Sequence, residues 1–79
     1  MDFEIIGHTD SQGDEQFNQI LSASRAETVM YALEKRGLNA KHMQATGKGS
    51  KEPIASNKSK TGKSKNRRVE ILVKESSRS

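Results

Sequence analysis

The sequence predicts an α/β fold: a small two-layer α/β sandwich in the order strand, helix, strand, long loop, strand. Three observations lead to this prediction. One long helical pattern stands between β-rich segments, a helix of this kind can connect two parallel strands of one sheet, and 79 residues suffice for only one small domain. Hydrophobic residues make up 30% of the chain, so we expect a small core of marginal stability.

The first strand is predicted at residues 2–6, where β-forming residues run up to Gly7. A helix is predicted at residues 14–36, because acidic residues open its first turn, basic residues close its last turn, and Gly37 follows as a stop. At helical spacing, one face of this helix gathers apolar side chains: Leu21, Ala26, Val29, Ala32 and Leu33, with Ile20, Met30 and Tyr31 expected to broaden the face.

The second half of the chain has two shorter β signals separated by a polar connection. An extended piece is predicted near residues 42–46, and residues 47–66 are rich in Gly, Ser, Lys and Asn, which indicates a long loop with a turn of helix near 61–66. In "RRVEILVKE", Val69, Ile71 and Val73 alternate with mostly polar residues, the pattern of a half-buried strand. We expect one domain over residues 1–75 and a disordered tail at 76–79.

Charge divides the chain into an acidic and a basic half. Residues 1–40 hold 3 Lys/Arg and 7 Asp/Glu, a net of −4, whereas residues 41–79 hold 11 and 3, a net of +8, which together give +4. The basic cluster Lys58, Lys60, Lys63, Lys65, Arg67 and Arg68 suits either a solvated surface loop or a polyanion-binding surface. Nucleic acid is not expected, because the cluster contains no aromatic side chain on which bases can stack.

Several other classes of protein are not expected. The chain has no cysteine and therefore no disulfide, and no apolar run or signal peptide indicates a membrane span or a secretion leader. His8, Asp10 and His42 do not have the spacing of a metal site, and "NKSKTGKS" lacks the first glycine of a phosphate-binding loop. With no catalytic constellation in the sequence, we expect neither an enzyme nor a cofactor.

Arg25 is a charged residue at a position where the helical pattern predicts an apolar one. It falls within the apolar face of the predicted helix, after Asn18 and Ser22 on the same side, and a buried guanidinium must be paired or face a binding site. The carboxylate best placed to meet it is Asp10, in the segment "GHTDSQG" that follows the first strand. The two alternatives are an internal Asp10–Arg25 salt bridge and a pair of charges that together face a ligand.

Most of the chain, from residue 3 to residue 73, resembles the OmpA-like peptidoglycan-binding domain found in OmpA, Pal and the MotB stator proteins. The resemblance rests on four segments in order: "GHTD", "N…LS..RA", "G.G…P…N" and "NRRVEI". It implies that Asp10 receives the ammonium group, and Arg25 the carboxylate, of diaminopimelate in the peptidoglycan stem peptide. It also implies that Asn18 lines the same cleft, that Arg67 supports its floor, and that Thr9 and Ser11 offer backbone donors there.

The family fold usually starts with a further strand and helix, which this sequence does not contain. Without them we expect an uncovered face or edge of the sheet, and a homodimer in which another copy supplies the missing part is one expected arrangement. The resemblance implies a periplasmic module whose parent protein carries any membrane attachment. The alternatives kept open are the wall anchor of a flagellar stator and, from another class, a basic polyanion-binding module.

Overall fold

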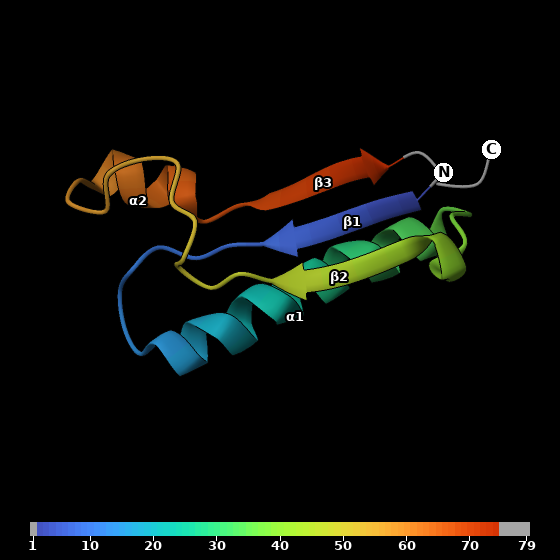
Figure 1. Cartoon of the computed structure of the whole chain (residues 1–79), viewed down its shortest axis with the longest axis horizontal. Helices are drawn as coiled ribbons and strands as arrows, with labels where there is room; N and C mark the ends of the chain where they lie inside the picture. The colour runs from blue at the N-terminus through green and yellow to red at the C-terminus, as the bar shows by residue number, and fades with distance from the viewer. Residues whose placement is uncertain (1, 75–79) are drawn as a thin grey trace.

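The strands and helices lie close to where the sequence signals place them, and the computed structural model describes residues 2–74 (Figure 1). The predicted tail at 76–79 and residue 75, the predicted end of the domain, lie outside the described residues. The elements are, in order, β1 (Asp2–Gly7), α1 (Glu15–Lys35), the short 3-10 helix η1 (Ala40–His42), β2 (Met43–Gly47), α2 (Lys60–Asn66) and β3 (Val69–Lys74). The predicted order and fold class are confirmed.

Helix α1 begins and ends at capping residues that the sequence shows. The Asp14 carboxylate accepts a hydrogen bond from the backbone N–H of Phe17 at 3.2 Å, and Gly37 leaves the helix with φ +105°, a backbone conformation that favours glycine. Its N–H donates to the Glu34 carbonyl at 3.0 Å.

Within the part of the chain that the structure describes, no helix is long and apolar enough to cross a membrane.

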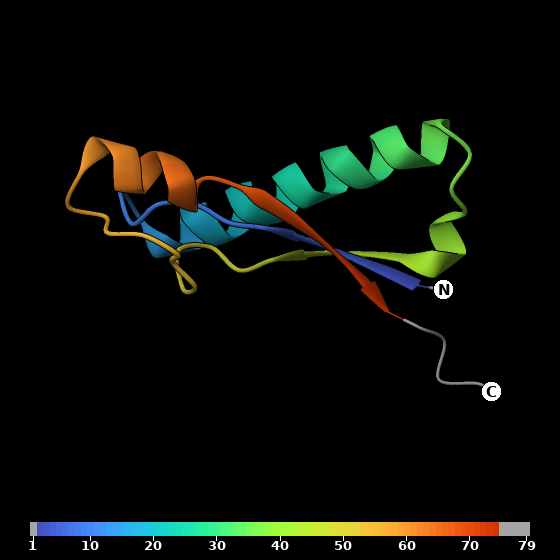
Figure 2. The same ribbon diagram turned by 90° about the horizontal axis from the view of Figure 1, so that it is seen from above.

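The three strands form one sheet in the order β2-β1-β3. β1 and β2 are parallel and are connected through α1, whereas β3 runs antiparallel to β1. Figure 2 shows α1 as a separate layer on one side of the sheet, with α2 beyond the end of the strands. Because of this topology, the carboxyl ends of β1 and β2 and the first residues of β3 meet at one edge of the molecule, beside α2 (Figure 1).

Two glycines let α1 lie directly on the strand ends. A Cβ atom added at Gly7 would overlap the Ser22 carbonyl, and one added at Gly47 would lie 2.5 Å from the backbone nitrogen of Ala23. Ser22 and Ala26, both 0% exposed, are the small helix residues on this contact face. The close approach therefore buries polar helix side chains, Asn18 and Ser22, under the carboxyl ends of the strands.

The apolar core is narrower than the sequence predicted. The buried hydrophobic residues are Ile5, Ile6 and Ala26; the remaining members of the predicted helix face are half-buried, except Ala32, which is exposed. The expectation that Ile20 and Tyr31 broaden the face was wrong, since they are 68% and 60% exposed. With the helix backbone so close to the strands, only a narrow strip of α1 meets the sheet.

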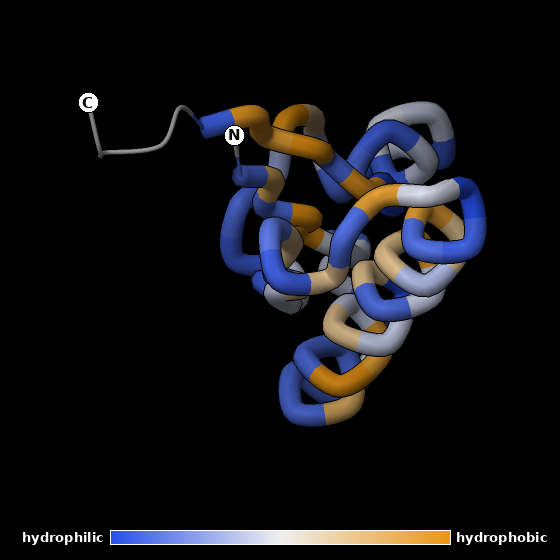
Figure 3. Tube along the Cα trace, turned by 90° about the vertical axis from the view of Figure 1, so that its right-hand side faces the viewer, coloured by the Kyte–Doolittle hydropathy of each residue, from blue (hydrophilic) through white to orange (hydrophobic). Residues whose placement is uncertain are grey.

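β3 also differs from its prediction as a half-buried strand. Ile71 and Val73 are 47% and 57% exposed, and Leu72 on the opposite face is 45% exposed. The reason is that α1 packs over β1 and β2 and leaves β3 uncovered at the edge of the sheet. In Figure 3 the apolar run of β3 lies at the top of the molecule, clear of the α1 coil.

Candidate functional site

The residues after β1 form a turn, residues 8–13, that is hydrogen-bonded to both of its neighbours. We call it the strand-end turn. The His8 N–H donates to the Arg68 carbonyl at 2.8 Å, and the Thr9 N–H donates to the Gly49 carbonyl at 2.9 Å. His8, Thr9 and Asp10 are 1%, 4% and 7% exposed. The turn is therefore a fixed part of the fold, and its polar residues are held in one geometry.

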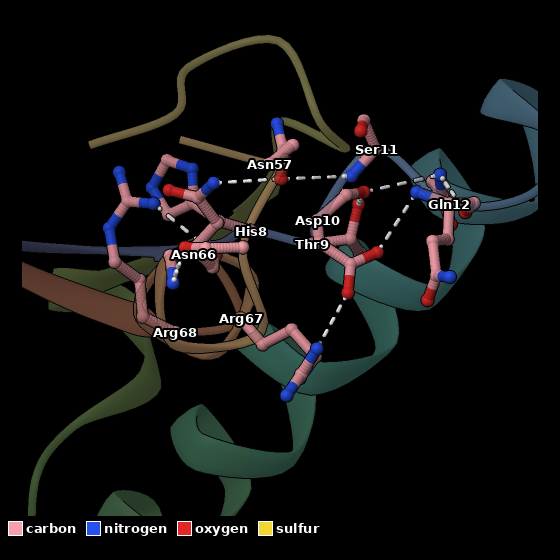
Figure 4. A network of polar contacts seen from close by, with 12 residues as sticks. His8, Thr9, Asp10, Ser11, Gln12, Asn57, Asn66, Arg67 and Arg68 are labelled. Atoms are coloured by element: carbon pink, nitrogen blue, oxygen red, sulfur yellow. Dashed lines mark hydrogen bonds and ion pairs between the residues drawn. The ribbon is translucent and has the colours of Figure 1, made fainter. Parts of the chain in front are cut away.

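The Asp10 carboxylate accepts two hydrogen bonds within this turn and across it (Figure 4). Oδ1 accepts from the Gln12 backbone N–H at 3.0 Å, and Oδ2 accepts from Nη1 of Arg67 at 2.6 Å. The Gln12 hydrogen bond, followed by the one from Arg67, holds the pKa of Asp10 below its usual value, although burial opposes the shift. Asp10 is thus an ionised, oriented carboxylate at neutral pH.

Arg25 reaches the same turn from α1 and makes a different contact. Its Nη1 donates to the His8 carbonyl at 3.4 Å, a long hydrogen bond, and the residue is half-buried. Among residues 2–74, no carboxylate lies within ion-pairing distance of Arg25. The internal Asp10–Arg25 salt bridge, one of the two alternatives raised by the sequence, is therefore not formed, because Arg67 occupies the Asp10 carboxylate.

Asn18 supports the strand-end turn from the helix side. Its side-chain nitrogen donates to the Gln12 carbonyl at 3.0 Å and to the Asp10 carbonyl at 3.5 Å, and the residue is only 4% exposed. Asn18 thus lies beside the predicted site residues, as the sequence suggested, but beneath the turn. Its hydrogen bonds position the backbone of Asp10.

The backbone N–H groups of Thr9 and Ser11, which the sequence analysis expected to act as donors at the site, are both hydrogen-bonded within the fold. The Thr9 N–H is bonded to the Gly49 carbonyl, and the Ser11 N–H donates to Oδ1 of Asn57 at 3.3 Å. Both donors are taken because the loop after β2 runs along the turn and satisfies its backbone. The Thr9 hydroxyl also stays within the turn, where it donates to the Asp10 carbonyl at 2.9 Å.

Arg67 closes the other side of the site. It is the C-cap residue of α2, and its side chain remains 42% exposed while it contacts Asp10. Figure 4 shows its guanidinium pointing toward the Asp10 carboxylate across the turn. The structure therefore brings together Asp10, Arg25, Asn18 and Arg67 at the strand-end turn, with Arg67 in direct contact with Asp10.

Two asparagines that the site prediction missed connect the turn to α2. Asn66 is 0% exposed; its Oδ1 accepts from the N–H groups of Ile54 and Ala55 at 2.8 and 3.0 Å, and its Nδ2 donates to the Ala55 carbonyl at 3.0 Å and to Oδ1 of Asn57 at 2.8 Å. Asn57 in turn accepts from Ser11. A buried side-chain amide can replace backbone pairing in a loop. The sequence signals were Asn57, which ends the segment "G.G…P…N", and Asn66, which begins "NRRVEI".

His8, the first residue of the strand-end turn, belongs to a second cluster of polar side chains. Its Nε2 lies 3.1 Å from Oε1 of Glu70, and Oε2 of Glu70 accepts from Nε of Arg68 at 3.0 Å. The Arg68 hydrogen bond is the main cause that lowers the pKa of Glu70, with His8 adding to it. This contact ties the strand-end turn to β3 and places His8 out of reach of His42, which pairs with Asp2 near the start of the strands.

Metal-ligating clusters and surface hollows were sought among the described residues. Among the described residues, no three His, Asp or Glu side chains gather as metal ligands do. One surface hollow of about 250 Å³ lies near His42 and Lys74, and another of about 430 Å³ lies along the outer side of α1 near Tyr31. The strand-end turn instead holds charged groups of both signs: the Asp10 carboxylate is largely buried and paired with Arg67, and the Arg25 guanidinium lies at the His8 carbonyl. Such an arrangement can bind a ligand that carries both signs of charge.

Comparison with known families and proteins gives matches over most of the chain. The model described as "OmpA family" matches residues 1–67. The outer-membrane lipoprotein YfiB of Pseudomonas aeruginosa is 46% identical over 69 residues, which are 87% of this chain and 41% of that protein. The peptidoglycan-binding protein ArfA of Mycobacterium tuberculosis is 49% identical over 69 residues, again 87% of this chain and 21% of that protein.

A solved structure gives the same result for the fold. The C-terminal domain of Helicobacter pylori MotB superposes with a TM-score of 0.88 at 33% identity, and the match covers 96% of this chain and 59% of that domain. The chain therefore spans less than two thirds of each of these three relatives.

Proposed function

The chain belongs to the OmpA family, and from this membership we propose that it is a non-catalytic module that binds peptidoglycan and tethers an envelope protein to the cell wall. A relative named for peptidoglycan binding, ArfA, supports the proposed ligand. The outer-membrane lipoprotein YfiB supports an envelope location. We propose that the module works in the periplasm and that any membrane attachment belongs to other parts of the parent protein.

The observation that carries the proposal is the pair of unlike charges at the strand-end turn. Asp10 is an ionised carboxylate, and Arg25 contacts the carbonyl of His8, two residues before it. Diaminopimelate carries an ammonium group and a carboxylate on one carbon at the end of its side chain. We propose that Asp10 receives the ammonium group and that Arg25 holds the carboxylate, since a planar guanidinium can grip a carboxylate through two parallel hydrogen bonds.

Arg25 suits this role because it is available. Its hydrogen bond to His8 is long, at 3.4 Å, and the described residues give it no ion-pair partner. A half-buried guanidinium without a carboxylate is costly to hold. An incoming carboxylate supplies the missing partner, so the cost is relieved on binding. The same reasoning supports a ligand with a carboxylate over one with an amine alone.

Arg67 is proposed to prepare Asp10 for the ligand. It keeps the carboxylate ionised and oriented, and its exposed guanidinium has further N–H groups that point away from Asp10. Asn18 acts from below by fixing the backbone of the turn. In this proposal Asp10 and Arg25 contact the ligand, Arg67 borders it, and Asn18, Thr9 and Ser11 hold the turn in shape.

Two alternatives have a specific observation in their favour. The similarity to a MotB domain at a TM-score of 0.88 supports the wall anchor of a flagellar stator, which would use the same site in another parent protein. The exposed lysines 58, 60 and 65 support a basic surface for anionic polymers. Polyanion binding depends on unscreened charge and weakens with salt, whereas recognition of a zwitterion at a partly buried site does so much less.

Binding to purified peptidoglycan sacculi at rising salt concentration tests the proposal. Binding that persists at high salt and is competed by a soluble stem peptide supports recognition of the wall. Binding that disappears at high salt, and is competed equally well by an unrelated polyanion, would identify the basic module instead. The wild-type chain and Arg25→Ala, measured side by side, separate the site from the general charge.

A further inference from the structure

The Asp10 carboxylate already has a cationic partner within the fold. Nη1 of Arg67 lies 2.6 Å from Oδ2 of Asp10, whereas Oδ1 accepts from the Gln12 backbone N–H, and Figure 4 shows the two contacts on different oxygens. An ionised carboxylate has about four acceptor positions, so it can receive a ligand ammonium group as well. Because the Asp10 side chain is only 9% exposed, that ammonium group must lie close to the Arg67 guanidinium.

The charges around this carboxylate do not balance. Arg67 and Arg25 each bring a positive charge to the strand-end turn, one from the end of α2 and one from α1. The charge of Lys63, also in α2, acts on the same carboxylate. Glu70, which contacts the start of the turn, is already paired with Arg68. One carboxylate therefore stands against two guanidinium groups, and the turn has a surplus of positive charge.

The end of the diaminopimelate side chain does not remove this surplus. It carries one ammonium group and one carboxylate, so it adds no net charge. Bound as proposed, its ammonium group shares Asp10 with the Arg67 guanidinium, and two like charges so close together at a partly buried site repel each other. A further carboxylate of the ligand at Arg67 would offset this repulsion and balance the charge.

We propose that Arg67 binds a second carboxylate of the stem peptide, so that the site recognises an anionic peptide and not the zwitterion alone. This inference rests on the proposed function. Among the described residues, the Arg67 side chain makes one hydrogen bond, to Asp10, and it is 42% exposed. A guanidinium has five N–H donors in a planar fork, so Arg67 can keep its contact with Asp10 and hold another carboxylate with its remaining N–H groups.

The stem peptide has two carboxylates of this kind. The γ-linked glutamate that precedes diaminopimelate keeps its α-carboxylate, and the last residue of the peptide ends in another. Both groups have the same charge and the same pair of oxygens, so Arg67 can bind either. Peptides in which one or the other is converted to a carboxamide separate the two sources, because a carboxamide has nearly the same shape and no charge.

Calorimetric titration at about pH 7.5 tests the inference with three diaminopimelate peptides: the acid form, the glutamate amide and the C-terminal amide. Asp10 is ionised at this pH with or without Arg67, since its ordinary pKa is 3.8, so the effect of Arg67 on that pKa does not enter. We expect the wild type to bind the acid form about 3- to 10-fold more tightly than at least one amide. The amide that weakens binding identifies the carboxylate.

Variants of Arg67 assign this preference to its guanidinium. In Arg67→Gln the acid form and the amides should bind with affinities within about twofold of each other, and Arg67→Lys should keep part of the preference because it keeps the charge. Lys51→Gln, which removes an exposed positive charge from the loop after β2, is the matched control and should keep the full preference. Circular dichroism checks that each variant is folded.

The outcomes separate this inference from the proposed function. A wild type that binds the acid form and both amides equally tightly, or a folded Arg67→Gln chain that keeps the full preference, would overturn the second carboxylate site and leave wall binding through Asp10 and Arg25 standing. A wild type that binds none of the three peptides would overturn the proposed function, and this inference with it.

Discussion

The Asp10 carboxylate is paired with Arg67, 57 positions away along the chain, at a distance of 2.6 Å, and not with the helix residue Arg25. This relationship decides what the strand-end turn can do. An Asp10–Arg25 pair would have closed the site on itself. With Arg67 as the partner of Asp10, Arg25 has no carboxylate partner among the described residues, and this is the basis of the proposal that Arg25 holds a carboxylate of the ligand.

The pH dependence of binding should depend on Arg67. The folded-state pKa of Asp10 lies below its ordinary value of 3.8, first through the Gln12 hydrogen bond and then through Arg67. A depressed carboxylate pKa contributes stability that is present above the unfolded pKa and is lost as the pH falls through the folded pKa. Arg67→Gln should therefore raise the Asp10 pKa and shift the loss of ligand binding to higher pH.

An NMR titration of the Asp10 carboxyl carbon in the wild type and in Arg67→Gln measures this shift. Part of the depression should remain in the variant, because the Gln12 N–H still donates to Oδ1. Lys51→Gln, which removes an exposed charge from the loop after β2, is the control and should leave the titration unchanged. An unaltered Asp10 pKa in Arg67→Gln would mean that the ion pair does not control the carboxylate.

Asn66 should be the polar residue on which the fold depends most. Asn66→Ala removes a buried amide that makes four hydrogen bonds and leaves the N–H groups of Ile54 and Ala55 without their partner. We expect a loss of about 2–4 kcal/mol in the free energy of unfolding, because each unpaired buried group costs about 1–3 kcal/mol. Urea denaturation followed by circular dichroism measures it.

Asn57→Ala is the comparison for this prediction, since Asn57 is less buried and its Oδ1 serves only Ser11 and Asn66. Asn57→Ala should lower the free energy of unfolding clearly less than Asn66→Ala does. If the two variants unfolded at the same urea concentration, Asn66 would not be the anchor of the loop.

The lysines at 58, 60, 63 and 65 should affect attraction to the wall more than recognition. Lys60, Lys63 and Lys65 lie within α2, so the predicted loop is partly helical. Of the four lysines, only Lys63 contributes to the lowered pKa of Asp10. Replacing all four with glutamine should lower the apparent affinity for sacculi at low ionic strength and leave the affinity for a short stem peptide within about twofold, since exposed charges are screened. A collapse of stem-peptide binding would make this segment part of the site.

Local sequence signals predicted the helices and strands well, because capping and turn residues mark where they begin and end. Asp14 and Gly37 bound α1, and the short β-rich runs set β1 and β3 to within about a residue. Burial was predicted less well. The exposure of Ile20 and of β3 depends on where α1 rests on the sheet, and the close contacts at Gly7 and Gly47 that fix this position arise only in three dimensions.

The site was also predicted only in part, because some of its contacts arise only when the chain is folded. Arg25 is conspicuous because a charge interrupts an apolar helix face, and Asp10 is conspicuous because it follows a strand. The Asp10–Arg67 pair and the Ser11–Asn57 hydrogen bond join segments that are far apart in the chain, and nothing in the local pattern indicates such partners. The backbone donors of Thr9 and Ser11 are likewise occupied by distant residues, Gly49 and Asn57.

The central claim is that Asp10 and Arg25 together form a receptor for a zwitterion, and removing the Arg25 charge separates binding from folding. Arg25 makes one long hydrogen bond, so Arg25→Ala should fold normally and bind about 10- to 100-fold more weakly, in line with about 1.5–3 kcal/mol for a charge-assisted contact. Arg25→Lys should recover little of the loss, because an ammonium group cannot form two parallel bonds to a carboxylate. Asp10→Ala should weaken binding by a similar factor.

The most direct test is calorimetric titration of two soluble stem peptides, one with diaminopimelate and one with lysine, which lacks the second carboxylate. The wild type should prefer the diaminopimelate peptide by about 10- to 100-fold. Arg25→Ala should bind the two peptides almost equally, and Asp10→Ala should bind both weakly. Equal affinity of the wild type for the two peptides, or folded Asp10→Ala and Arg25→Ala variants that bind normally, would contradict the claim.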